Sequence, residues 1–167
     1  MNQKDIFEKA YEDLADPIFR YIYYRVFDRD TARDLTQETF YKVWDSIVKG
    51  NKIENIKAFL YRTALNSIVN SIRDKKKTVS IEQLEEEIGF DIADTKQEEM
   101  ETQMSDIASI LDSFTILKEQ DAELMQLRYV DGLSIEEISE ITRYSVTNIS
   151  VKIHRILEVL KKYHNTP

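Results

Sequence analysis

Residues that interrupt helices are scarce in this chain. Only three glycines and two prolines occur among its 167 residues, which leaves few positions for the tight turns and bulges that sheet proteins need. Leucine, isoleucine, glutamate, lysine and glutamine instead fill long stretches in which apolar residues recur at helical spacing. The sequence therefore predicts an all-α protein, and its length is enough for two small helical domains, each with its own core.

The first domain is predicted to span residues 1–77 and to contain four helices. Apolar residues recur from 6 to 27, where Asp16 before Pro17 predicts a cap and a second helix start, so a helical hairpin is expected. The third helix is expected over 31–49, where a glycine stops it, and the fourth over 56–77. The inner side chains expected for these two helices are Leu35, Thr39, Val43, Ile47, Ile56, Phe59, Leu60, Ile68 and Ile72.

An acidic linker, residues 78–103, is predicted to follow. Ten acidic side chains and one basic side chain lie between Ser80 and Asp106, with few large apolar residues. Such a segment buries too little apolar surface to fold by itself, so we expect it to be flexible.

The second domain, residues 104–167, is predicted to contain four helices. The first two are expected over about 104–114 and 119–130, before the stop signal Asp131-Gly132. A short helix, a brief turn and a longer helix then follow, which is the spacing of a helix-turn-helix.

Strong start signals mark the last two helices. Ser134 and Glu137 form a capping box, and Leu133 with Ile138 forms a hydrophobic staple. Ser145 is the expected cap of the last helix. The inner face of that helix is expected to contain Val146, Ile149, Ile153, Ile156 and Leu160.

The outward face of the last helix carries side chains suited to DNA. In a helix-turn-helix the second helix enters the major groove, where asparagine can bind adenine and arginine or lysine can bind guanine or phosphate. The candidate DNA-binding residues are Thr147, Asn148, Ser150, Val151, Lys152, His154 and Arg155. An ordinary helical hairpin with a solvated outer face has the same spacing and is the alternative.

The charge and composition of the chain argue against several classes of function. The net charge of −8 argues against a protein that coats nucleic acid by bulk electrostatics, so any DNA contact must be local. The chain has no cysteine and only two histidines, His154 and His164, which argues against disulfides and a metal site. It has no nucleophile paired with a base and no glycine-rich phosphate loop, so we expect neither an enzyme nor a cofactor. No apolar run has the length of a membrane span, and a cytoplasmic location is expected.

Several segments resemble the motifs of one protein family. Residues 117–120, 124–138 and 151–155 closely resemble the promoter −35-binding domain of extracytoplasmic-function (ECF) sigma factors of the sigma-70 family. Residues 34–44 are similar to the family's polymerase-binding helix, and residues 58–66 to its −10-reading helix. The resemblance implies an alternative sigma factor, which carries RNA polymerase to particular promoters and directs transcription initiation there.

The resemblance also implies partners and binding residues. Asp34, Gln37 and Glu38 would dock on the clamp helices of the polymerase, with Phe40 and Trp44 at the rim of the same interface. The residues implied at the −10 element are Asn51, Lys52, Asn55, Lys57, Tyr61, Arg62, Asn66 and Arg73. The implied partners are core RNA polymerase, promoter DNA and an anti-sigma factor.

Departures from the family pattern leave two alternatives open. A basic residue is usual at the position of Ser150, and a Gly-Thr pair often stands at Thr147-Asn148. Arg143-Tyr144 occupies the turn where a Leu-Gly pair is common, so the left-handed position must be met without glycine. One alternative is a sigma-like decoy that binds an anti-sigma factor or polymerase but reads no promoter. The other is a helix-turn-helix repressor whose first domain senses a ligand.

Overall fold

The computed structural model describes residues 2–78 and 107–165. Contacts along the chain separate it into two units, which we call unit 1 (residues 2–78) and unit 2 (residues 107–165). The described residues form helices, turns and loops without a strand. The prediction of an all-α protein built from two helical units is therefore confirmed, whereas the acidic linker falls outside the described residues.

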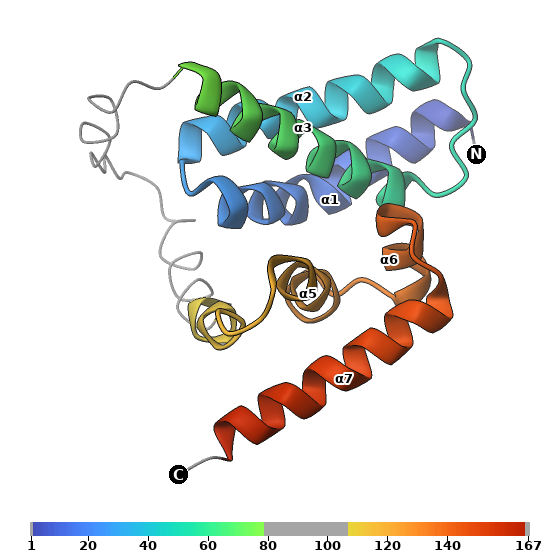
Figure 1. Cartoon of the computed structure of the whole chain (residues 1–167). Coiled ribbons are helices and arrows are strands. Elements are labelled where there is room, and N and C mark those ends of the chain that lie inside the picture. The colour runs from blue at the N-terminus through green and yellow to red at the C-terminus, as the bar shows by residue number, and fades with distance from the viewer. Residues whose placement is uncertain (1, 79–106, 166–167) are drawn as a thin grey trace. The chain divides into compact units, whose positions relative to one another are not determined.

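Unit 1 is a bundle of three helices that all pack against one another (Figure 1). The helices are α1 (Gln3–Val26), α2 (Arg29–Val48) and α3 (Ile56–Thr78). Large side chains from each helix meet in the core without contact with solvent. The fully buried ones include Ile18, Tyr21, Ile22, Val43 and Leu60.

The helical hairpin predicted around Pro17 is wrong, because α1 is one continuous helix with the proline inside it. Proline lacks an N–H and costs a helix about 3 kcal/mol in its interior. The buried stripe nevertheless continues across it, from Ala10 to Ile18, Tyr21 and Ile22. Packing of this stripe against α2 and α3 therefore holds both halves of α1 in line, and unit 1 has three helices where four were predicted.

The turn from α1 to α2 contains a strained residue followed by a cap. Phe27 ends α1 in the left-handed conformation with a φ of 54°. Asp28 then caps α2 by accepting a hydrogen bond from the Thr31 amide at 3.1 Å, and its carboxylate also accepts from the Thr31 hydroxyl. The hydroxyl, followed by the amide and the charge of Lys75, holds the pKa of Asp28 below its ordinary value, against an opposing effect of burial.

The predicted stop at Gly50 is confirmed in its geometry. Gly50 has a φ of 89°, its amide donates to the Ile47 carbonyl at 3.0 Å, and the Asn51 amide donates to the Ser46 carbonyl at 3.1 Å. This pair of bonds is a Schellman motif, which satisfies the last carbonyls of α2. The chain then runs without helix to Asn55, the residue before α3.

Five of the nine inner residues predicted for α2 and α3 are buried, and Ile47, Ile56 and Phe59 are half-buried. Leu35, Thr39 and Val43 are buried, as are Leu60 and Ile68. The Thr39 hydroxyl donates to the Leu35 carbonyl at 2.7 Å, so its burial leaves no unpaired donor. Ile72 is exposed instead, because it lies in the last turns of α3.

Unit 2 consists of short helices that cover one side of a long final helix. Residues 107–113 are helical, and α5 (Glu119–Met125) continues directly into a π-helical turn, η2 (Gln126–Val130). They are followed by α6 (Ile135–Thr142) and α7 (Val146–His164), and α5 and α6 both pack against α7. These segments correspond to the four predicted helices, with the π-turn as an unpredicted feature.

The start signals predicted in unit 2 are present as hydrogen bonds. Ser134 accepts from the Glu137 amide at 3.1 Å, and the Glu137 carboxylate accepts from the Ser134 amide at 2.8 Å, which completes the capping box. Leu133 and Ile138 of the staple are both fully buried. Four of the five inner residues predicted for α7 are buried, whereas Val146 at its first position is exposed.

The turn between α6 and α7 is formed without glycine, as predicted. Arg143 takes the left-handed position with a φ of 67° and donates its amide to the Ser139 carbonyl at 2.8 Å. Ser145 then caps α7 by accepting from the Asn148 amide at 3.1 Å. Among the described residues, no helix combines the length and the apolar character that crossing a membrane would need.

Replacing Pro17 with alanine is expected to raise the free energy of unfolding by about 1–2 kcal/mol, because it restores a helical hydrogen bond in α1 while losing a little chain stiffness. Urea unfolding monitored by circular dichroism measures the change. A loss of stability would instead indicate that the proline is needed to start a second helix.

Replacing Asp28 with alanine is expected to lower the free energy of unfolding by about 1 kcal/mol at pH 7, because the cap of α2 is lost. Since the folded pKa of Asp28 is lowered, its contribution is present above the unfolded pKa of about 3.8 and is lost as the pH falls through the folded pKa. The difference between wild type and Asp28→Ala should therefore shrink in acid. Asp28→Asn is the control, since it keeps an acceptor for the cap without a titrating group.

Candidate functional sites

The surface of α2 predicted to bind polymerase carries acidic and amide groups in solvent. Asp34, Gln37 and Glu38 are all exposed, since the opposite side of α2 is buried in the bundle. Carboxylates placed in this way attract basic partner groups without a large desolvation cost. We call these three residues the acidic row of α2.

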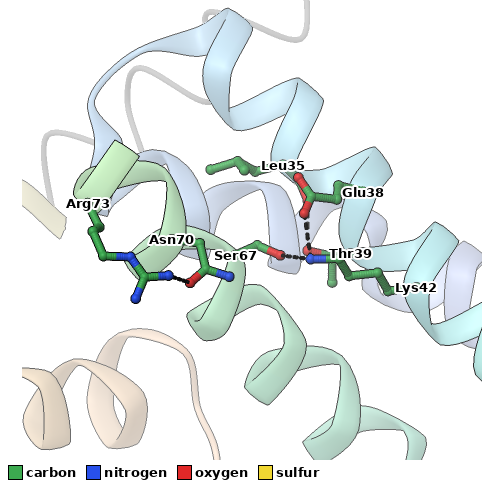
Figure 2. Close-up of polar contacts among 7 residues, drawn as sticks. All are labelled: Leu35, Glu38, Thr39, Lys42, Ser67, Asn70 and Arg73. Carbon is green, nitrogen blue, oxygen red and sulfur yellow. Dashed lines mark hydrogen bonds and ion pairs between the residues drawn. The ribbon is translucent and has the colours of Figure 1, made fainter. Parts of the chain in front are cut away.

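Glu38 is held by a lysine of the same helix. The Lys42 ammonium lies 2.5 Å from the Glu38 carboxylate and 3.4 Å from the hydroxyl of Ser67 on α3, as Figure 2 shows. Ser67 is only 1% exposed, so the lysine bridges a surface carboxylate and the edge of the bundle core. The position of Glu38 within the acidic row is therefore tied to the contact between α2 and α3.

An aromatic groove lies between α1 and α2. Its rings contact one another: Phe7 is 5.0 Å from Trp44, and Tyr11 is 4.9 Å from Phe40, measured between ring centroids. The groove has a volume of about 360 Å³. Its lining residues are Lys4, Phe7, Glu8, Tyr11, Phe40, Tyr41 and Trp44.

Phe40 and Trp44, the two aromatic residues of the predicted polymerase interface, thus differ in how deeply they are buried. Phe40 is 4% exposed and forms part of the floor of the groove, so it supports the surface rather than presenting its ring to a partner. Trp44 is half-buried, and its ring lies against Phe7. Tyr41, which is not among the candidate residues, is 67% exposed beside them and lies one turn after Gln37.

The loop before α3 uses some of its predicted −10 groups for structure. The Asn55 side-chain oxygen accepts from the Ala58 amide at 3.1 Å and so caps α3. The Asn51 amide group donates to the Ser46 hydroxyl at 3.1 Å, which folds this side chain back toward α2. Lys52 is exposed.

The outward side of α3 carries three of the predicted −10 residues on one stripe. Arg62, Asn66 and Arg73 recur at helical spacing, with Asn66 and Arg73 exposed and Arg62 half-buried. Arg73 donates to the Asn70 side chain at 2.7 Å, so its guanidinium is oriented along the helix (Figure 2). Lys57 belongs to a different side of α3.

The burial of Tyr61 contradicts the DNA-facing role inferred for it. Tyr61 is 1% exposed, and its ring packs edge-on against Tyr21 at 5.1 Å between centroids. A ring in this position cannot stack on a base. Its aromatic character serves the contact between α1 and α3 instead.

All but one of the candidate residues on α7 are exposed. The exception is Lys152, which is half-buried, and Ile149, Ile153 and Ile156 turn the opposite side of the helix into the core. The outward side chains on α7 are Thr147, Asn148, Ser150, Val151, His154 and Arg155. This is the arrangement that a recognition helix needs.

Two of these α7 residues have local partners. His154 faces Glu158 at 3.5 Å, an ion pair when the imidazole is protonated. The Ser150 hydroxyl donates to the Val146 carbonyl at 3.0 Å. Both groups can still accept or donate outward, since they lie on the exposed face.

Comparison with protein families gives matches to both units. The model for sigma-70 region 2 matches residues 10–78, and the model for sigma-70 region 4 matches residues 106–160. The region 2 match spans the acidic row of α2 and the stripe of α3. The region 4 match includes α5 and α6 and extends to residue 160 within α7.

Individual proteins agree with these matches. The chain is 27% identical over 165 residues to the RNA polymerase sigma factor YlaC of Bacillus subtilis, covering 97% of this chain and 94% of YlaC. It is 26% identical over 161 residues to the ECF RNA polymerase sigma factor BldN of Streptomyces coelicolor, covering 96% of this chain and 61% of BldN. Its fold resembles that of the sigma factor RpoE, solved with the anti-sigma factor NepR from Bartonella quintana, with a TM-score of 0.60 at 17% identity over 93% of this chain and 94% of RpoE.

Replacing Tyr61 with alanine is expected to lower the free energy of unfolding of unit 1 by about 3–5 kcal/mol, because the buried ring leaves a cavity beside Tyr21. Asn66→Ala, on the exposed side of the same helix, is the control and should change it by less than about 0.5 kcal/mol. Urea unfolding of both variants makes the comparison. Equal stabilities would contradict the core role of Tyr61.

Proposed function

The chain belongs to the ECF branch of the sigma-70 family, and on that premise we propose that it binds core RNA polymerase and directs transcription initiation at particular promoters. The observation that carries the proposal is the pairing of two surfaces in family order. An acidic, solvent-exposed row lies on α2 within the region 2 match, and a capped helix-turn-helix lies within the region 4 match.

The proposal assigns a task to each part of the chain. Residues 1–77 bind the polymerase clamp through Asp34, Gln37 and Glu38, with the half-buried Trp44 beside them. The same domain holds the −10 element through Asn51, Lys52, Arg62, Asn66 and Arg73. Residues 78–103 connect it to residues 104–167, whose last helix contacts the −35 element.

The chemistry of these surfaces supports binding rather than catalysis. Acidic groups on α2 suit a basic protein partner, and amide, hydroxyl and basic groups on α3 and α7 suit DNA. The polymerase would perform the reaction while this chain contributes binding free energy, in the cytoplasm where polymerase acts. An anti-sigma factor is a further proposed partner, since the structurally similar RpoE was solved with one.

A decoy that binds polymerase or an anti-sigma factor without reading promoters is the second candidate. The observation favouring it is the modest basic character of the candidate DNA-binding residues of α7. Among these residues Lys152 and Arg155 are the only lysine and arginine, and His154 faces Glu158. Few phosphate contacts mean weak binding of DNA.

Run-off transcription separates these candidates. Purified core polymerase is incubated with fragmented DNA from the source organism, with and without the chain, and the RNA starts are sequenced. Discrete new starts that share −10 and −35 elements are expected. Binding to core without new starts would favour the decoy, and absence of binding to core would overturn the proposed function.

Replacing Asp34 with arginine is expected to weaken binding to core polymerase at least about thirtyfold, because like charges placed together at an interface cost several kcal/mol. Glu12→Arg, an equal change of charge at an exposed position of α1, is the matched control and should bind within about twofold of wild type. Titration of labelled chain with core polymerase measures both affinities, and circular dichroism checks that the helices are intact. Equal losses would indicate a general charge effect and would contradict docking through Asp34.

A further inference from the structure

An aromatic ring in the turn of the helix-turn-helix lies against a basic side chain of the last helix. The ammonium nitrogen of Lys152 is 4.5 Å from the centroid of the Tyr144 ring. A cation at this distance over the face of a ring is attracted by the negative charge of that face. The contact thus links the loop between α6 and α7 to the second helical turn of α7.

The backbone of the turn fixes the point from which the ring projects. The Tyr144 carbonyl accepts from the Ser139 hydroxyl at 2.6 Å, and its amide donates to the Thr142 hydroxyl at 3.4 Å. Arg143, immediately before it, is committed to the left-handed conformation. The backbone of Tyr144 is therefore held in place, and its ring projects from a fixed point of the turn.

Lys152 occupies the flank of α7, not the centre of its outward face. It follows the exposed Val151 and precedes the buried Ile153, and it is itself half-buried. When a recognition helix enters a major groove, the centre of its outer face meets base edges, and its flanks face the groove walls, where the phosphates lie. The position of Lys152 suits a phosphate more than a base.

We propose that Tyr144 is a positioning residue that holds the Lys152 ammonium ready to contact a phosphate beside the −35 element. This inference rests on the proposed function. A lysine side chain has several rotatable bonds, and ordering them on binding costs entropy. The ring restricts those bonds before DNA arrives, so part of that cost is already met.

The contact should raise affinity without changing sequence preference. Phosphates carry no direct sequence information, so a prepositioned phosphate contact strengthens binding to every −35 sequence alike. Specificity would remain with the exposed Asn148 in the first turn of α7 and the exposed Arg155 in its third turn.

A double-mutant cycle in the holoenzyme tests the inference. The full chain is assembled with core polymerase, and binding is measured on a promoter fragment found by run-off transcription. Tyr144→Leu removes the ring but keeps apolar bulk, and it should weaken binding about two- to fivefold. Tyr144→Phe keeps the ring and should bind like wild type. In a Lys152→Met background, Tyr144→Leu should cause no further loss.

Each outcome has a defined meaning. A loss from Tyr144→Leu that persists in the Lys152→Met background would show that Tyr144 only shapes the turn, and unchanged binding by Tyr144→Leu would likewise overturn the inference. Lys152→Met should also reduce the salt dependence of binding by about one phosphate contact, and an unchanged salt slope would overturn the phosphate role.

Failure of the proposed function would look different. In that case the wild-type holoenzyme itself would select no promoter, and the inference would fall with the function. The ring contact can still be measured in the chain alone by NMR, where the Lys152 methylene protons next to the ammonium should be shifted upfield by the Tyr144 ring, and Tyr144→Leu should abolish that shift.

Discussion

The burial of one side of α2 is the constraint on which the candidate docking surface depends. Leu35, Thr39 and Val43 are buried in the bundle that α2 forms with α1 and α3. Because a helix has a fixed period, this burial forces Asp34, Gln37 and Tyr41 outward. The acidic row is therefore a consequence of the core, and any change that rotates α2 would move the row as well. The same reasoning holds in unit 2, where the buried isoleucines of α7 turn its polar side chains to solvent.

Side-chain caps, rather than glycines, set most of the helix boundaries. Asp28, Asn55, Ser134 and Ser145 each accept a hydrogen bond from an amide in the first turn of a helix. Two helices end at residues other than glycine in the left-handed conformation, Phe27 and Arg143, and each such position costs about 1 kcal/mol. In both cases the next helix is capped within two residues, so the cap offsets the strain and makes the turn short. The short turn between α6 and α7 also brings Tyr144 within reach of Lys152.

Sequence patterns predicted the features that depend on neighbours along the chain. The capping box at Ser134, the cap at Ser145, the helix stop at Gly50 and most of the inner face of α2 all follow from local chemistry. The errors arose where tertiary packing overrides local preference. Pro17 signals a helix start by itself, yet the stripe around it packs as one helix.

Tyr61 and Asn66 lie on the same helix and both look polar enough to meet DNA, but their positions relative to α1 bury Tyr61 and expose Asn66. Some contacts, such as Phe7 with Trp44 or Tyr144 with Lys152, join residues whose spacing in the sequence does not predict that they are close in space.

The electrostatics of the chain indicate why such a protein would need a partner to hold DNA. Its net charge of −8 repels a polyanion at long range, so association must rely on short-range contacts. Several basic groups near the candidate surfaces are already engaged: Lys42 with Glu38, Arg73 with Asn70, and Lys152 with the Tyr144 ring. Each contact orients a cation but adds no net positive charge. It therefore favours a defined geometry of binding rather than long-range attraction to DNA. A chain built in this way gains little from binding DNA non-specifically, because non-specific affinity scales with the number of phosphates neutralised. Docking through the acidic row would add the positive surface of a larger assembly, and the few oriented cations would then serve to align the chain on its promoter.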